Sequence, residues 1–179
     1  AGCYYVQEAG SMFLEFILKN TLDFNNKLRV LDVCAAPGGK STLINSLLNG
    51  ESLLVSNEII KSRADVLSQN LSKWGTCNSI VTNGDPSRFT EIHAFFDCIV
   101  VDAPCSGSGL FRKQPDAINE WSEDSVKACG IRQKRILEDV LPALKDSGIL
   151  IYSTCSYSIE ENENIVESLI NSHGLEYVP

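Results

Sequence analysis

LRVLDVCAAPGGKST, residues 28–42, is the stretch of sequence that decides the fold. It begins with an apolar run of strand length, residues 28–33, and passes into a loop with two adjacent glycines. The loop leads into a segment whose apolar side chains recur at helical spacing. A buried strand, a tight glycine loop and a helix, in this order, indicate the first unit of an α/β domain. The glycines also let the backbone approach a ligand closely.

The same alternation of strand and helix signals continues along the chain. Further apolar runs predict strands at 52–57, 79–83, 96–102 and 148–154. Apolar stripes at helical spacing occupy 12–17, 43–48, 136–144 and 165–170. Strands that alternate with helices imply right-handed crossovers and a mostly parallel sheet with helices on both faces. We therefore expect an α/β fold.

The composition restricts the classes of protein that this chain can belong to. Its 179 residues, 44% of them hydrophobic, suit a single domain with a substantial core. No apolar run could span a bilayer and no signal peptide is visible, so we expect a cytoplasmic protein without a membrane partner. Seven cysteines without a C-x-x-C pair, and only two histidines, argue for reduced thiols and against a metal site. A net charge of −8 counts against phosphate binding by the chain as a whole, although it permits a local basic patch.

Polar residues gather where the predicted strands end. Asp32, Glu58, Asp85, Asp102 and Cys155 lie at or just past the carboxyl ends of the five runs. In sheets of this kind, ligands bind beyond the carboxyl ends of the strands. Taken singly, each acid is better explained as a solvated loop residue or a helix N-cap. As an ordered set, the acids favour a ligand site.

The loop after the first strand indicates which ligand. Its end, Gly39-Lys40-Ser41, imitates a phosphate-binding P-loop, but position 34 is a cysteine where a P-loop has glycine. The dinucleotide pattern G-x-G-x-x-G is also absent. Glu58 could accept the two hydroxyls of a ribose, and Asp85 could meet an adenine amino group. These features fit a nucleoside without phosphates, such as S-adenosylmethionine.

Three motifs in this order resemble one known family. LDVCAAPGGKST (31–42), DAPCSGSG (102–109) and YSTCSYS (152–158) are similar to motifs of the Sun/Fmu family of RNA cytosine-5 methyltransferases, in particular to its bacterial 16S ribosomal RNA type. GCYYVQEAGSM (2–12) and RKQPDA (112–117) are also similar to signatures of that family. The resemblance covers nearly the whole chain. It implies a Rossmann-like class I methyltransferase fold, S-adenosylmethionine as cofactor, and RNA, in particular ribosomal RNA, as partner.

The resemblance also assigns roles to individual residues. The cofactor would be bound by the loop and the strand-end acids, namely Cys34, Ala35, Ala36, Pro37, Gly38, Gly39, Lys40, Glu58, Asp85 and Asp102. Cys155 would be the nucleophile that adds to carbon 6 of cytosine, and Cys105 would assist release of the methylated product. Asp102 would also orient the base and stabilise the adduct, with Lys40 at the junction of cofactor and base. Within the loop we expect the backbone of Cys34 to matter more than its thiol.

The residues around Cys155 are compatible with that role. Ser158 and Glu161 read as a capping box that opens the next helix. A helix N-terminus close by would favour the thiolate. From the residues alone, Cys155 is explained equally well as a small side chain at the end of an inner strand.

The RNA contacts and the extent of the domain are further expectations. Positive charge after the DAPC motif suggests phosphate contacts by Arg112, Lys113, Lys127, Arg132, Lys134 and Arg135, although an ordinary solvated helix face explains each one singly. The target cytosine must be unpaired or flipped to reach a thiol. By comparison with the family, residues 1–179 read as a catalytic domain cut at both ends. The final hairpin would be missing, and an RNA-binding module could lie elsewhere in the parent chain.

Two other functions remain open at the level of sequence. One is a DNA cytosine-5 methyltransferase that uses Cys105, since a cysteine after a proline is the nucleophile of DNA-type enzymes. The other is a non-catalytic RNA-binding assembly factor that keeps the fold. The presence of both Cys155 and Asp102 argues against the second, because a binding module needs neither.

Overall fold

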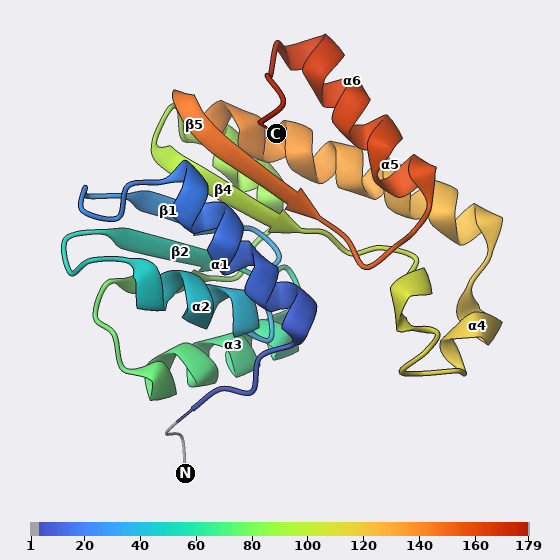
Figure 1. Cartoon of the computed structure of the whole chain (residues 1–179), viewed down its shortest axis with the longest axis horizontal. Coiled ribbons are helices and arrows are strands. Elements are labelled where there is room, and N and C mark those ends of the chain that lie inside the picture. The colour runs from blue at the N-terminus through green and yellow to red at the C-terminus, as the bar shows by residue number, and fades with distance from the viewer. Residues whose placement is uncertain (1–3, 179) are drawn as a thin grey trace. The chain divides into compact units, whose positions relative to one another are not determined.

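The computed structural model describes residues 4–178, which form two compact units. The first unit takes in the chain up to Asp102 together with residues 139–151. It contains a five-stranded sheet of order β3-β2-β1-β4-β5 (Figure 1). The strands are β1 (Arg29–Asp32), β2 (Leu53–Asn57), β3 (Ser79–Thr82), β4 (Phe96–Asp102) and β5 (Leu144–Ser153).

The pairs β1–β2, β1–β4 and β2–β3 of this sheet are parallel, and each keeps one register along its length. β1 pairs with β2 from Arg29 opposite Leu53, and with β4 from Val30 opposite Cys98. β2 in turn pairs in parallel with β3. The carboxyl ends of these strands therefore meet at one edge of the sheet, where the loop after β1 lies. The predicted α/β fold with a Rossmann-like parallel sheet is confirmed.

Three helices stand along one side of the sheet, each touching the next in line (Figure 1). They are α1 (Ala9–Thr21), α2 (Gly39–Leu47) and α3 (Lys61–Trp74), and the unit also holds the short 3-10 helices η1 (Pro86–Glu91) and η3 (Leu141–Ala143). Gly75 ends α3 in the left-handed conformation, with φ of 86°. A glycine adopts this conformation without the steric cost that a side chain would carry.

The core of the first unit lies between the sheet and the helices α1 and α2. Its buried members are Leu14, Leu18, Leu28, Val30, Leu43, Ile44, Leu54, Cys98, Val100 and Ile151. Cys98 is fully buried, as expected of a core cysteine. The helix predicted before the first strand is present, but of its expected apolar stripe Ile17 packs against the core whereas the other three side chains do not. Met12, Phe13 and Phe16 are exposed, because the side of α1 that packs inward is the one that carries Leu14 and Leu18.

The second unit comprises residues 103–138 and 152–178. Its elements are η2 (Ser108–Leu110), α4 (Ala117–Glu120), α5 (Glu123–Val140), η4 (Ile159–Glu161) and α6 (Glu163–His173). The apolar stripe predicted at 136–144 falls on α5 and η3, except for Leu144, which begins β5. The stripe predicted at 165–170 falls on α6. Within residues 4–178, no helix combines the length and the apolar character needed to cross a bilayer.

Candidate functional site

The loop between β1 and α2 is the centre of the candidate cofactor site. Gly38 stands at the N-cap of α2 with φ of 110°, a conformation that strains any residue with a side chain. Its carbonyl accepts the first helical bond, from the amide of Thr42. The loop thus turns directly from a buried strand into a helix and presents its backbone beyond the end of β1.

Side chains from α3 and the backbone of β2 hold this loop in place. Arg63 donates to the carbonyl of Ala36 at 2.8 Å, and Asn70 donates to the carbonyl of Pro37 at 2.7 Å. The amide of Ala35 donates to the carbonyl of Asn57 at the end of β2. Neither of these α3 residues was predicted from the sequence. The available signal was their spacing of seven, which puts two polar side chains on one face of a helix.

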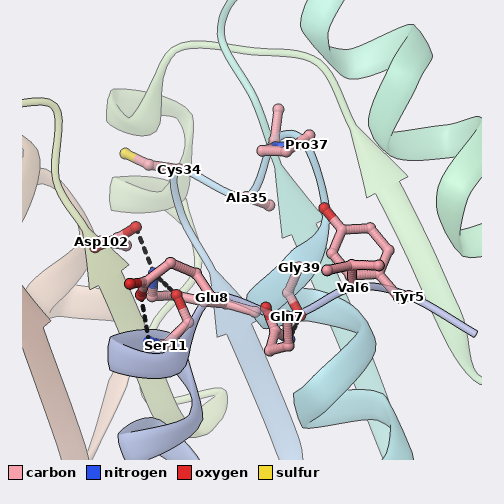
Figure 2. Close-up of a pocket in the computed structure, with 12 residues that line it drawn as sticks. Tyr5, Val6, Gln7, Glu8, Ser11, Cys34, Ala35, Pro37, Gly39 and Asp102 are labelled. Carbon is pink, nitrogen blue, oxygen red and sulfur yellow. Dashed lines mark hydrogen bonds and ion pairs between the residues drawn. The ribbon is translucent and has the colours of Figure 1, made fainter. Parts of the chain in front are cut away.

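A cavity of about 190 Å³ opens beside the loop. Figure 2 shows the loop from Cys34 to Pro37 on one side of it, and Gln7 and Glu8 from the segment before α1 on the other. The lining residues are Tyr5, Val6, Gln7, Glu8, Ser11, Cys34, Ala35, Ala36, Pro37, Gly39, Lys40 and Asp102. Of the ten residues predicted to bind the cofactor, seven therefore line this cavity: Cys34, Ala35, Ala36, Pro37, Gly39, Lys40 and Asp102.

The segment before α1 contributes a wall that sequence analysis did not foresee. Gln7 donates from its side-chain amide to the carbonyl of Gly39 at 2.6 Å. A Cβ at Gly39 would lie only 2.8 Å from Gln7 Oε1 and 3.2 Å from the ring of Tyr5. Gly39 therefore permits a close approach between the loop and this segment. The signal in the sequence is the motif at 2–12, whose resemblance to the family assigns no role to these residues.

Lys40 and Asp102 form an ion pair at the edge of the cavity. Lys40 Nζ lies 2.8 Å from Asp102 Oδ2 and donates to Ser11 Oγ at 3.2 Å. The pair brings together the start of α2, the end of β4 and the first turns of α1 (Figure 2). It therefore fixes a carboxylate and an ammonium side by side where three elements converge.

Asp32, at the end of β1, is fully buried behind this loop. Its Oδ2 accepts from Ser41 Oγ at 2.6 Å, whereas Oδ1 has no hydrogen-bond partner among the described residues. Burial raises the pKa of Asp32 to about 7, and nearby Asp102 and Glu58 add to the rise that Ser41 and Lys40 oppose. Near neutrality the group thus gains or loses a proton readily.

The raised pKa of Asp32 predicts how stability depends on pH. The folded protein keeps this proton up to about pH 7, whereas an unfolded aspartate releases it near 3.8. Since the unfolded state then binds fewer protons, the free energy of unfolding should fall as pH rises between these values. Relative to Asp32→Asn, which cannot titrate, the fall should approach about 1.4 kcal/mol per pH unit. Urea unfolding of both proteins at about pH 5 and about pH 8 measures it, and parallel profiles would contradict it.

Glu58 and Asp85 do not line the cavity, although both were predicted to bind the cofactor. The side chain of Glu58 is buried, accepts from the amide of Ile60 at 3.0 Å and lies 3.4 Å from Arg63. Asp85 caps η1 and accepts from the amide of Ser87. Gly38, the third predicted residue outside the lining, acts through the turn that it permits. The roles of the two acids in binding ribose and adenine stay predictions.

Cys34 lines the cavity as an inert thiol. Burial raises its pKa to about 12, with the carboxylates of Asp32, Glu58 and Asp102 adding to the shift. The thiol therefore stays protonated at neutral pH. This agrees with the expectation that the backbone of the residue matters more than its sulfur.

The second unit brings the two predicted catalytic cysteines together. Cys105 Sγ and Cys155 Sγ lie 3.1 Å apart, although the residues are separated by 50 positions in the chain. Cys105 is half-buried and Cys155 is exposed. The amide of Gly109 donates to the carbonyl of Cys155 at 2.7 Å, which ties the loop after Cys105 to the loop that carries Cys155.

The contact with Cys155 changes the acidity of Cys105. It raises the pKa of the Cys105 thiol far above its ordinary value, with burial as the second cause. Cys105 is therefore a thiol, held against the sulfur of the more exposed Cys155. A partner that stays protonated can donate to a neighbouring thiolate.

The predicted capping box at Ser158 and Glu161 is wrong. Ser158 makes no side-chain capping bond, and α6 begins only at Glu163. The carboxylate of Glu161 accepts hydrogen bonds from Ser106, Ser156 and Gln133 instead. The motif has the spacing of a capping box, but its glutamate accepts hydrogen bonds from side chains and an amide elsewhere in the unit.

The predicted phosphate contacts all belong to the second unit and are exposed. They are Arg112, Lys113, Lys127, Arg132, Lys134 and Arg135, and the last four lie on α5. Lys134 lies 3.9 Å from Glu138, one helical turn further on. The structure thus leaves these side chains accessible, while their role in RNA binding stays a prediction.

The fold is that of the S-adenosylmethionine-dependent methyltransferases. A solved S-adenosylmethionine-dependent O-methyltransferase from Thermotoga maritima superposes with a TM-score of 0.62 over 93% of this chain and 52% of its own, at 15% identity. The sequence model of the 16S rRNA methyltransferase RsmB/F family matches residues 19–178. The chain therefore belongs to the 16S rRNA methyltransferase RsmB/F family.

Individual relatives agree with this assignment. Ribosomal RNA small subunit methyltransferase F of Aeromonas hydrophila is 40% identical over 175 residues, which cover 97% of this chain and 37% of the relative. The NSun6 structure from Pyrococcus horikoshii with SFG has a TM-score of 0.83 at 28% identity, covering 95% of this chain and 42% of its own. A methyltransferase homolog from the same organism has a TM-score of 0.83 at 33% identity, covering 98% and 53%. The chain thus spans little more than a third of the Aeromonas relative.

The residues around the cavity fit S-adenosylmethionine as cofactor. This molecule carries a positive sulfonium and an ammonium group, so acidic surroundings stabilise it. Asp102 and Glu8 line the cavity, and the buried Oδ1 of Asp32 has no partner among residues 4–178. The narrow glycine loop suits a ligand without phosphates. The glycine loop and the two carboxylates that line the cavity together match the chemistry of this cofactor.

Proposed function

We propose that the protein transfers a methyl group from S-adenosylmethionine to carbon 5 of a cytosine in small-subunit ribosomal RNA. The observation that carries this proposal is the pair of thiols, Cys105 and Cys155, with their sulfur atoms 3.1 Å apart. A cofactor-binding methyltransferase needs no thiol to methylate an oxygen or an amine. Carbon 5 of cytosine, in contrast, is a poor nucleophile and requires covalent activation.

Cys155 supplies this activation. Its thiolate adds to carbon 6, and the electrons of the 5,6 double bond shift to a new double bond between carbons 4 and 5 as N3 takes up a proton. The resulting enamine makes carbon 5 nucleophilic. The bound cofactor supplies the methyl group from its sulfonium. After transfer, a base removes the proton from carbon 5, the 5,6 double bond re-forms, and the thiolate leaves carbon 6. Exposure of Cys155 supports this role, because the attacking sulfur must reach a base that comes from outside.

Cys105 and Asp102 assist the nucleophile. The Cys105 thiol, in contact with Cys155, can donate its proton to the sulfur of Cys155 as that sulfur leaves carbon 6, which supports a role for Cys105 in product release. Asp102 would hydrogen-bond to the amidine edge of the cytosine and so orient the base. It would also contact the cofactor. Its ion pair with Lys40 gives that carboxylate a fixed position at the edge of the cavity.

The environment of Cys105 argues against the DNA-type alternative. Cys105 would have to be the thiolate, yet its contact with Cys155 and its burial raise its pKa far above the ordinary value. The thiol pair also argues against a non-catalytic assembly factor, because two adjacent sulfurs, one of them exposed, serve no purpose in binding alone.

The RNA partner would meet the second unit. Six cations of this unit are exposed, four of them on α5, and we assign phosphate contacts to them despite the net charge of −8. The target cytosine would be unpaired or flipped, since a stacked base cannot reach a thiol. We further propose that residues 1–179 are one catalytic domain of a cytoplasmic protein, in which an additional RNA-binding module supports affinity.

Release of tritium from RNA tests this function. Unmodified small-subunit ribosomal RNA, labelled with tritium at carbon 5 of cytosine, is incubated with the full gene product and S-adenosylmethionine. We expect one tritium released for each methyl group incorporated, because methylation replaces that hydrogen. Methyl transfer to RNA without tritium release would contradict cytosine-5 chemistry. Release from duplex DNA and not from RNA would support the DNA-type alternative.

A further inference from the structure

A buried carboxylate stands between the two cysteine loops. Glu161 is fully buried, yet four hydrogen-bond donors from three segments of the second unit surround it. Its Oε1 accepts from the amide of Ser106 at 2.8 Å and from Gln133 Nε2 at 3.0 Å. Its Oε2 accepts from the hydroxyls of Ser106 at 2.5 Å and Ser156 at 2.6 Å. Both oxygens are therefore fully engaged.

The donors are the immediate neighbours of the two thiols. Ser106 follows Cys105 directly, and Ser156 follows Cys155 directly. Gln133 of α5 donates at the same time to the carbonyl of Pro104, the residue before Cys105, at 3.0 Å. One carboxylate thus anchors, directly or through Gln133, the residues on both sides of Cys105 and the residue after Cys155.

The hydrogen bonds keep Glu161 charged. Burial alone would raise its pKa, but the bonds from Ser106, Ser156 and Gln133 together outweigh burial and hold the pKa below the ordinary value. The ionised group makes each of these bonds charge-assisted, and such bonds are about twice as strong as neutral ones. The backbone of Glu161 is itself fixed, because its carbonyl accepts from the hydroxyl of Tyr152 at 2.6 Å.

We propose that Glu161 is the positioning residue that holds the Cys105 and Cys155 loops at a fixed separation, so that both thiols can act on one cytosine. The catalytic part of this inference rests on the proposed function. The geometric part does not, since the distance between the thiols can be measured without RNA. A residue that served only the stability of η4 and α6 would not control that distance.

The first test measures the thiol pair itself. The full gene product is equilibrated with reduced and oxidised glutathione. Each protein disulfide formed between Cys105 and Cys155 consumes one oxidised glutathione and releases two reduced ones. Mass spectrometry after alkylation gives the equilibrium constant. In Glu161→Gln we expect this constant to fall about tenfold, because loosened loops lower the effective concentration of one thiol at the other. The matched control is Glu160→Gln, which removes an equal charge from the exposed neighbouring side chain.

The second test separates positioning from binding. With Glu161→Gln we expect kcat for 5-methylcytosine formation to fall about 100-fold while the KM for RNA stays within about twofold, since misplaced reacting groups affect the chemical step. Ser106→Ala and Ser156→Ala should show smaller losses in the same direction. Circular dichroism shows whether Glu161→Gln is folded. If it is not, the two serine variants still test the proposal.

The outcomes distinguish this proposal from the function on which it rests. The positioning role would be overturned if Glu161→Gln had the same equilibrium constant for disulfide formation as the wild type. It would also be overturned if Glu161→Gln and Glu160→Gln changed that constant equally. If the disulfide constant fell in Glu161→Gln but the wild type transferred no methyl group to any RNA, Glu161 would still hold the two loops at a fixed separation. The proposed reaction would then be rejected. Loss of RNA binding with unchanged kcat would show a structural role alone.

Discussion

RNA that contains 5-fluorocytosine should form a covalent complex with the wild-type protein that survives a denaturing gel. Fluorine at carbon 5 cannot leave as a cation, so the reaction stops after methyl transfer with the thiolate still bonded to carbon 6. Cys155→Ser should form no detectable complex, because a serine hydroxyl lacks the acidity and the nucleophilicity of a thiol. Its methylation of ordinary RNA should fall at least about 1,000-fold.

The second cysteine provides the decisive comparison. Cys105→Ser should still trap fluorinated RNA, and on ordinary RNA it should accumulate the adduct because release is slowed. Cys77→Ser, a change at an exposed cysteine of the first unit, serves as the matched control and should behave as wild type. If only Cys105→Ser lost the complex, the roles of the two thiols would be reversed and the DNA-type mechanism would be favoured.

Gly109→Ala should also reduce methyl transfer strongly, although the change adds a single methyl group. A Cβ at this position would lie 2.5 Å from the carbonyl oxygen of Cys155 and 3.2 Å from its carbonyl carbon. Both atoms belong to the backbone, so no side-chain rotation relieves the clash, and the loop that carries Cys155 must move. We expect methyl transfer to fall about 100-fold, as for other displacements of reacting groups by about 1 Å. Initial rates of tritium release measure the loss.

A second glycine supplies the control for this substitution. A Cβ added at Gly50 would meet no heavy atom within 4 Å, so Gly50→Ala should leave both activity and stability unchanged. Gly109→Ala should also lower the free energy of unfolding by about 1–3 kcal/mol, the usual cost of overpacking. Wild-type rates and urea midpoints in Gly109→Ala would contradict the close contact between the two loops.

The sequence predicted the sheet well because its strands are continuous apolar runs. β5 is the exception, since it begins at Leu144 and the prediction began at 148. Residues 145–147 are Lys-Asp-Ser, which no apolar pattern identifies as strand. Lys145 forms an ion pair with Asp97 of β4, and this cross-strand partner lies 48 residues away. A single sequence gives no sign of such a pairing.

The site was predictable to the extent that it depends on local motifs. The loop from Cys34 to Lys40 stands out through its glycines, and both thiols stand out as cysteines after strands. Gln7 and Arg63 were not predictable, because each acts by reaching a distant carbonyl. Glu161 was recognised as a special position and given the wrong partners. Its motif fits a local cap, whereas its actual donors come from three separate segments.

The neighbouring positions of β4 and β5 in the sheet suggest how the attacking cysteine could change place during evolution or redesign. β4 and β5 are neighbours in the sheet, and each is followed within three residues by one of the two cysteines. The architecture therefore offers two neighbouring positions for a nucleophile, each at the start of a loop. An ancestral enzyme could transfer the attacking role from one loop to the other by point mutation, without altering a strand or the core. Descendants with different catalytic motifs could then share a common scaffold.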